Sequence, residues 1–324
     1  MEKNQLSTLF LDALNKIRFI RPRLVHEISD LLDMDEVSVY RRLRGAVRFT
    51  TDEMGLLAHR YHISLDNMMD EQPEGSYESW KMDFPLTVTD RGFDLDMIEQ
   101  NIPLMREFLE EPLTETGGAI GFLTRHFFMK YRELARFALF KWGRYYSNMN
   151  SYQRYDTVQV PDRLYTLFQE HIEMYSHIKH TFYIWDSRII SRLVNDIQYF
   201  RSMTLISDEG IARLKQDLHQ LLDDCESMAA QGQFLDTGNS FELHISPIDI
   251  DTSQVYMRFG DYWLYTVEVF GIRSILTFKP HVCADMARRI NQLKLTSILI
   301  SNSGEKERVL FFKKQREMVE GIKL

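Results

Sequence analysis

The chain has 324 residues, of which 44% are hydrophobic and 27% are charged, so we expect a globular protein of two or three domains and exclude a largely disordered one. Its formal net charge of −8 argues against a protein that coats nucleic acid indiscriminately, because an acidic surface repels phosphate. No stretch approaches the ~20 apolar residues that span a bilayer, and the start lacks a secretory signal pattern, so we expect a cytoplasmic protein that uses no membrane.

Residues 1–70 carry the pattern of a compact domain of five short helices. Their apolar residues recur at steps of three and four, which predicts helices that each bury one face. The second to fifth helices are each preceded by a residue suited to a helix start: Pro22, Asp35, Thr50 and Ser64. Thr50 also forms a capping-box pattern with Glu53, in which two side chains satisfy the free amides of the first turn.

The stretch 71–90 has no sustained period and contains Pro73, Gly75 and Pro85. Proline and glycine at this density interrupt regular structure, so we expect a linker. The remaining 91–324 would then form a regulatory, effector or dimerisation region.

Residues 94–231 have mostly helical spacing of their apolar side chains, which predicts a central helical region. Between 211 and 228 the apolar positions alternate steps of three and four, which is a heptad pattern. The pattern covers only about two and a half heptads, which is short for a coiled coil. One helix packed inside its own domain is therefore favoured over a dimer seam.

From residue 232 onward the pattern indicates an α+β region. Three apolar or alternating segments between turn residues predict strands with antiparallel neighbours: 241–250, 254–260 and 262–271. A helix, a strand and a final helix are expected to follow: 284–293, 297–300 and 305–319. The fold class predicted for the whole chain is mainly α with an α+β C-terminal part.

Four arginines gather in SVYRRLRGAVRFT, residues 38–50, with no acidic residue among them. Residues 1–70 hold 10 Lys and Arg against 11 Asp and Glu, so most of the negative charge lies elsewhere. The stretch HEISDLLDMDEVSVYRRLRG, residues 26–45, has apolar positions that bring two short helices together through a three- or four-residue turn. It resembles the helix-turn-helix of the repressor/Cro-like family of DNA-binding domains, over roughly residues 5–70.

Two positions differ from the usual pattern of that family. Asp33 stands at the turn position that often holds Gly, and Ser29 stands at a close-packing position that often holds Ala. Aspartate adopts a left-handed backbone more readily than most residues, and serine is small, so both are compatible with the motif.

The resemblance implies that the third helix enters the major groove of double-stranded DNA. The candidate DNA-binding residues are those expected on its outer side and just after it: Glu36, Val37, Ser38, Tyr40, Arg41, Arg42, Arg44 and Arg48. Arg41 is the candidate for reading a base, because its planar fork fits guanine O6 and N7, and the other arginines would contact phosphates. The alternative is a solvated basic helix end that complements the helix dipole. We expect a sequence-specific transcriptional regulator, and a homodimer because such proteins read two-fold operators.

Three patterns in residues 91–324 could bind a ligand. The first is Glu173, His177 and His180, which recur at i, i+4 and i+7 and would share one helix face. That spacing suits a metal ion, but no fourth ligand lies nearby, so an exposed polar face is the favoured interpretation.

The second pattern is a group of aromatic residues that could form core or line a pocket for an apolar or planar effector: Phe122, Phe127, Phe128, Tyr131, Phe137, Phe140, Trp142, Tyr145 and Tyr146. The third is SILISNSGEKERVLFF, where Ser301, Ser303 and Gly304 lie in a turn before a helix and could hold a phosphate or carboxylate. This turn resembles the serine-rich loop of sugar-isomerase domains. Ser303 as a simple N-cap is the favoured interpretation.

No phosphate loop, Gly-x-Ser-x-Gly, His-Glu-x-x-His or dinucleotide fingerprint occurs in the chain, so we expect no enzyme and no cofactor. Cys225 and Cys283 belong to no Cys-x-x-Cys pair and are expected to pack in the core. The expected partners are double-stranded DNA, a second copy of the chain and, as one option, a small-molecule effector. A protein–protein interaction module and an unassigned C-terminal enzyme are the alternatives.

Overall fold

The computed structural model describes these residues: 5–20, 24–61, 63, 65, 81–83, 87–89, 92–94, 96–146, 152–269 and 273–323. The chain divides into two units, Met1–Ser79 and Trp80–Leu324. This boundary lies inside the predicted linker 71–90. The prediction of a linker is wrong for its second half, because residues 81–83 and 87–89 form strands of the second unit.

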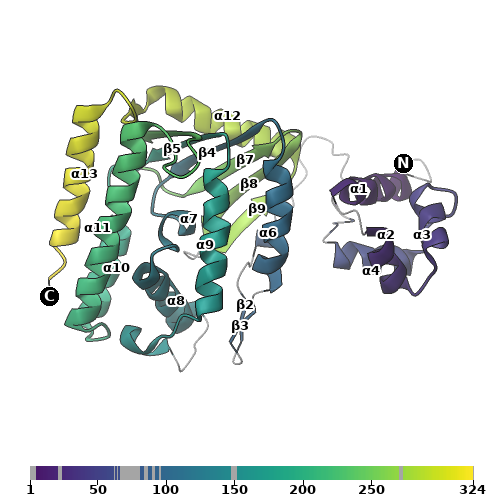
Figure 1. Cartoon of the computed structure of the whole chain (residues 1–324), viewed down its shortest axis with the longest axis horizontal. Coiled ribbons are helices and arrows are strands. Elements are labelled where there is room, and N and C mark those ends of the chain that lie inside the picture. Colours follow the sequence, from purple (N-terminus) through teal and green to yellow (C-terminus); the bar gives the residue numbers. More distant parts are fainter. Residues whose placement is uncertain are drawn as a thin grey trace. The chain divides into compact units, whose positions relative to one another are not determined.

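The first unit contains four helices among its described residues (Figure 1): α1 (Gln5–Ile20), α2 (Leu24–Leu32), α3 (Glu36–Leu43) and α4 (Thr51–Arg60). They enclose one apolar core, whose fully buried members include Phe10, Leu14, Ile28 and Val39. The predicted capping box of Thr50 and Glu53 is present at the start of α4. The fifth helix predicted at Ser64 lies outside the described residues.

The second unit is built on a mixed sheet whose strand order is β1-β9-β8-β7-β4-β5-β6-β10. Within the described residues the strands are β1 (Lys81–Asp83), β4 (Thr114–Ile120), β5 (His180–Trp185), β6 (Ser240–Ile245), β7 (Gln254–Phe259), β8 (Tyr262–Val269), β9 (Arg273–Thr277) and β10 (Ile298–Leu299). The neighbours β4, β5 and β6 are parallel, and the other pairs are antiparallel. β2 (Thr87–Thr89) and β3 (Gly92–Asp94) pair separately.

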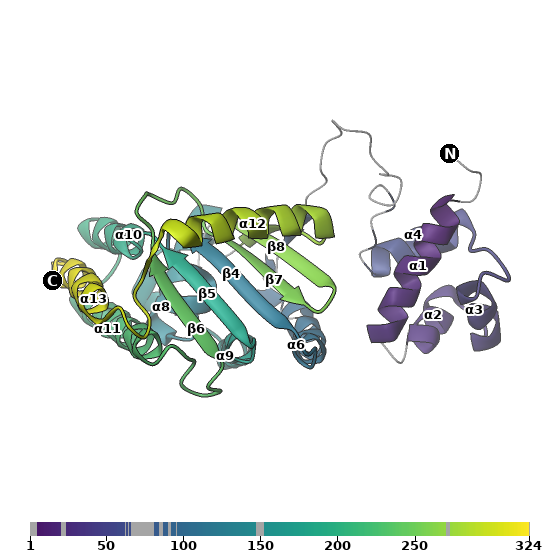
Figure 2. The same ribbon diagram turned by 90° about the horizontal axis from the view of Figure 1, so that it is seen from above.

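Helices cover both faces of this sheet. They are α6 (Asp96–Leu109), α7 (Arg125–Phe128), α8 (Arg132–Tyr146), the short 3-10 helix η2 (Tyr155–Thr157), α9 (Asp162–Ser176), α10 (Ser191–Ser202), α11 (Asp208–Gln231), α12 (Pro280–Thr296) and α13 (Glu305–Glu320). Figure 2 shows α12 across one face of the sheet, with α6, α8, α9 and α11 on the other. Along β5, Phe182 and Ile184 belong to the core under α12, whereas Tyr183 and Trp185 belong to the larger core on the opposite face.

The described part of the chain is therefore mixed α/β, and the predicted division at residue 231 is wrong. The supposedly helical region 94–231 contains β4 and β5, and β5 pairs with β6 across the predicted division. The predicted strand 241–250 is not a neighbour of β7, since β6 lies between β5 and β10. β9 was not predicted, whereas the antiparallel pairing of β7 with β8 is confirmed.

The strand β4 has an unusual sequence, TETGGAI, and Gly117 explains it. A Cβ atom built at Gly117 would lie 2.4 Å from Cζ of Phe182 and 2.5 Å from Cε1 of Tyr256. Glycine is required here because the rings from β5 and β7 pack directly over the β4 backbone. Such a glycine pair lowers strand propensity and hides the strand from pattern-based prediction.

The heptad positions of α11 face the core of the second unit. Ile211, Leu214, Leu218, Leu221 and Cys225 are all buried there. This confirms the favoured interpretation of one helix packed inside its own domain. The predicted C-terminal elements are also present, as α12, β10 and α13.

Candidate nucleic-acid interface

A tight turn joins α2 to α3. Asp33 has a left-handed backbone, with φ of 48°, a conformation that aspartate adopts more readily than most residues. The amide of Met34 donates to the carbonyl of Ser29 at 3.1 Å, and the Ser29 hydroxyl donates to the Met34 carbonyl at 2.5 Å. The two residues that differ from the usual pattern therefore build the turn themselves.

α3 begins at a strong N-cap. The carboxylate of Asp35 accepts hydrogen bonds from the Ser38 amide at 2.8 Å and the Ser38 hydroxyl at 2.7 Å. The side-chain hydrogen bond, followed by the amide bond, lowers the pKa of Asp35. Val39 and Leu43 are buried on the inner side of the helix. Ser38 is thus half-buried and engaged in the cap, so it is not a free donor for DNA.

The outer side of α3 is exposed and follows helical spacing. Val37 is 68% exposed, and Tyr40, Arg41 and Arg44 follow it at steps of three and four. Gly45, with φ of 75°, ends the helix and turns the chain toward Arg48, which is also exposed.

Three of the four arginines in this stretch carry unpaired charge. Arg41, Arg44 and Arg48 form no ion pair with any residue that the structure describes. Glu36 lies at the helix start, where its carboxylate is 3.3 Å from Nδ1 of His26. A cationic surface thus runs from the second half of α3 into the following segment.

Arg42 differs from the other three arginines, because its guanidinium group is bound to a carboxylate of the protein. The predicted phosphate contact of Arg42 is therefore wrong. Its Nη2 donates to Oε1 of Glu53 at 3.0 Å and its Nε donates to Oε2 at 3.3 Å. The two side chains are only 19% and 17% exposed. Burial raises the pKa of Glu53, but hydrogen bonds from the Thr50 amide and from Arg42 outweigh it and lower the pKa overall. Arg42 therefore fixes α3 to the start of α4.

The metal site considered for Glu173, His177 and His180 is not formed. α9 ends at Ser176, so His177 is its C-cap and His180 is the first residue of β5. The three side chains do not share a helix face. No group of three His, Cys, Asp or Glu side chains in the described part of the chain could hold a metal ion.

The turn at Ser301 serves the sheet. The Leu243 amide of β6 donates to the buried Ser301 hydroxyl at 2.5 Å. The N-cap of α13 is Gly304, which corrects the predicted cap at Ser303, and no side chain caps this helix. Ser301 is thus already engaged within the protein.

Most members of the predicted aromatic group are core residues. Phe137 and Phe140 pack against Phe200, with ring centroids 5.7 and 4.8 Å apart. Phe127 and Tyr131, however, line a cavity of about 450 Å³ between α7, α9 and α11. Tyr145 is exposed, and the side chain of Tyr146 lies outside the described part.

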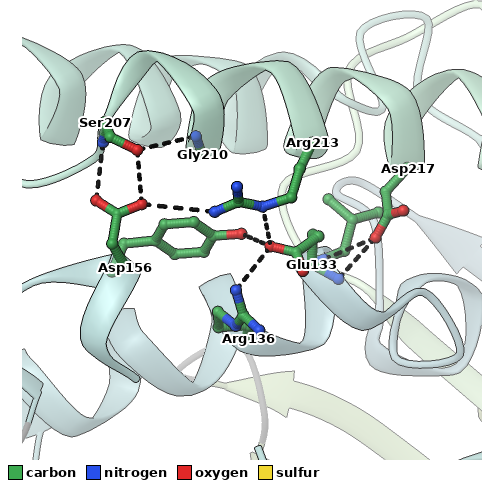
Figure 3. Close-up of polar contacts among 9 residues, drawn as sticks. Glu133, Arg136, Asp156, Ser207, Gly210, Arg213 and Asp217 are labelled. Carbon is green, nitrogen blue, oxygen red and sulfur yellow. Dashed lines mark hydrogen bonds and ion pairs between the residues drawn. The ribbon is translucent and has the colours of Figure 1, made fainter. Parts of the chain in front are cut away.

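A cluster of charged residues joins α8, η2 and α11 (Figure 3). Glu133 accepts hydrogen bonds from Arg136 at 3.0 Å, from Arg213 at 3.2 Å and from the Tyr155 hydroxyl. Its carboxylate is 13% exposed, so these three donors compensate for the loss of solvent.

Two further carboxylates in Figure 3 cap helices. Asp156 accepts from the amide and hydroxyl of Ser207, the N-cap of α11. Asp217 accepts from the amides of Glu133 and Leu134 in the first turn of α8, at 2.7 and 3.2 Å. Burial raises the pKa of Asp217 in spite of these bonds. Since each carboxylate has protein partners, the cluster is structural.

Comparison with protein-family models, curated proteins and solved structures finds no match to this chain. Across the described residues, every helix is too short or too polar to traverse a bilayer. The functional argument therefore rests on the chain's own residues, of which the exposed arginines after Tyr40 are the most distinctive.

Proposed function

We propose that the chain is a sequence-specific DNA-binding transcriptional regulator whose α3 enters the major groove. The observation that carries the proposal is the exposed side of α3, where arginines that form no ion pair with any described residue follow a capped helix start. An α-helix fits the major groove of B-DNA, and guanidinium groups bind both guanine edges and phosphates.

The arginines differ in their proposed roles. Arg41 lies within α3 and would read a base, whereas Arg44 and Arg48 lie at and beyond its C-terminus and would contact phosphates. Val37 could contact a thymine methyl group, because apolar side chains recognise that group in the major groove. The second unit would supply sensing or dimerisation.

A gel shift with DNA from the promoter region of the chain's own gene tests the proposal. The triple variant Arg41→Ala, Arg44→Ala, Arg48→Ala should lose specific binding at moderate salt. Arg41→Ala alone should cost about 1–3 kcal/mol and weaken discrimination at one base pair, and Arg48→Ala should lower the salt slope by about 1.

A matched control removes three exposed lysines of α13: Lys306, Lys313 and Lys314. It changes the net charge equally but should leave DNA binding intact. Equal binding by the wild type and the arginine variant would contradict the proposal, and would favour the solvated helix end or a protein-binding module.

A further inference from the structure

A second cavity, of about 200 Å³, lies on the sheet face opposite α12, between β7–β9 and the helices α6, α7 and α9. Its walls are largely apolar, with Met105 and Phe108 from α6 and Val255 and Met257 from β7. Four of the lining residues are basic or acidic, which is unusual for a core: Arg125, His126, His171 and Glu268. A small apolar cavity with a few convergent polar groups is typical of ligand sites.

Glu268 is buried in the wall of this cavity. It is 9% exposed, and its Oε1 has no hydrogen-bond partner among the described residues. Burial raises the pKa of Glu268 to about 8, although the charge and backbone amide of Arg125 and the charge of Lys141 act against this rise. At neutral pH the side chain is therefore mainly a protonated acid, which can donate a hydrogen bond.

The two histidines are also neutral. Burial, with a smaller effect from the Arg125 charge, lowers the pKa of His171 to about 4 and that of His126 to about 3. Nδ1 of His171 is buried without a partner among the described residues. Arg125 is therefore the charged group among the residues that line this cavity at neutral pH.

Unpartnered buried polar atoms cost free energy, which a ligand that pairs with them would recover. The larger cavity lacks this feature, because none of the described residues that line it has a buried side-chain nitrogen or oxygen without a hydrogen-bond partner. Lys130 donates to Asp224 at 2.9 Å, and Ser176 donates to Asp236 at 2.7 Å.

We infer that the smaller cavity binds a compact organic monocarboxylate, with its apolar body against Phe108 and the strands and its carboxylate facing Arg125, Glu268 and His171. A cationic ligand is disfavoured, because it would meet Arg125 and require Glu268 to ionise. That this ligand is an effector of transcription rests on the proposed function, whereas its binding to the smaller cavity does not.

Isothermal titration calorimetry on the full chain at pH 7 tests the inference, with benzoate as the probe and benzamide and benzylamine for comparison. Benzoate should bind saturably at one site, and benzylamine should not bind. Arg125→Gln should weaken benzoate binding by about 30-fold or more, because it removes a charge-assisted partner from a buried site. Arg163→Gln, an exposed arginine of α9 paired with Glu99, is the control and should leave binding unchanged.

The pH dependence provides a second readout. Above pH 8 the ionised Glu268 would repel the carboxylate, so the Kd for benzoate should rise by up to about tenfold per pH unit. The charges of Arg125 and Lys141 act on Glu268, and His126 and His171 line the same cavity with pKa values of about 3 and about 4, well below this range. Glu268→Gln should bind benzoate at pH 7 and show no such rise.

Three results would overturn the inference: no binding of either benzoate or 3-methylbutanoate, tighter binding of benzylamine than of benzoate, or unchanged affinity in Arg125→Gln. If that variant fails to fold by circular dichroism, Leu264→Trp, which fills the cavity from β8, should abolish binding instead. No DNA is present in these titrations, so a failure of DNA binding leaves their outcome interpretable. A gel shift with and without benzoate then tests the effector role separately.

Discussion

At the scale of single residues, the four arginines between positions 41 and 48 differ in their surroundings. Arg42 faces inward, because position 42 lies one turn after Ser38 and next to the buried Leu43, and it meets Glu53. Arg41 and Arg44 lie on the outer side of the same helix. A variant that removes Arg42 together with them would not separate a loss of stability from a loss of the proposed DNA contacts.

We predict that Arg42→Ala destabilises the first unit by about 1–3 kcal/mol, because Glu53 would keep its charge in a half-buried place without its main partner. Hydrogen exchange of the α3 and α4 amides in the full chain would measure this. Arg41→Ala is the control and should change exchange by less than about 0.5 kcal/mol. Equal hydrogen-exchange rates in the two variants would show that the pair of Arg42 and Glu53 does not stabilise the first unit.

An acidic residue in a largely apolar strand is the sequence signal that marks the smaller cavity. Glu268 stands in YWLYTVEV, a run otherwise made of aromatic, aliphatic and β-branched residues. A charged residue in such a run is rarely buried without a purpose. His171 and Arg125 carry no comparable signal, because only the folded chain brings α7, α9 and β8 together.

At the scale of elements, local hydrogen bonds determine where helices begin, and these are what the sequence predicts best. The caps at Asp35 and Thr50 depend on residues three positions apart. The predicted cap at Ser303 is wrong: the N-cap of α13 is Gly304, and the preceding turn is tied to β6, which is remote in sequence, by a hydrogen bond to Ser301. The strands β4 and β5 were missed because both of their faces are covered, so neither alternates polar and apolar residues.

The connection between α8 and α11 yields a prediction at this scale. Glu133→Ala should destabilise the second unit by about 3 kcal/mol, because Arg136 and Arg213 would lose a mostly buried carboxylate. Thermal or urea unfolding followed by tryptophan fluorescence would measure it. Glu317→Ala, at an exposed position of α13, should change the stability by less than about 0.5 kcal/mol. A similar small effect at Glu133 would show that the cluster contributes little.

At the scale of the whole molecule, the second unit has about three times as many residues as the first. The apolar side of α11 is buried in that unit, so a dimer cannot use the heptad pattern as its seam. The proposed homodimer therefore needs a surface other than the apolar side of α11.

We predict that two copies of the chain bind each operator. A two-fold protein reads half-sites about 10–10.5 base pairs, or roughly 34 Å, apart. Mass photometry of the DNA complex should show two chains per site. Insertion of about five base pairs between the half-sites should abolish tight binding, since it moves one half-site to the opposite side of the duplex. A complex with one chain that tolerates the insertion would contradict this prediction.

The sequence by itself determined the helices α1 to α4, the caps at Asp35 and Thr50, the turn at Asp33 and the exposed positions of Arg41 and Arg44 on α3, because all of these depend on residues a few positions apart. Only the tertiary structure decided that Arg42 is paired, that β4 and β5 form the centre of the sheet, and that Arg125, His171 and Glu268 meet around one cavity. Those features arise from contacts between segments far apart in the chain, which periodicity and capping do not encode.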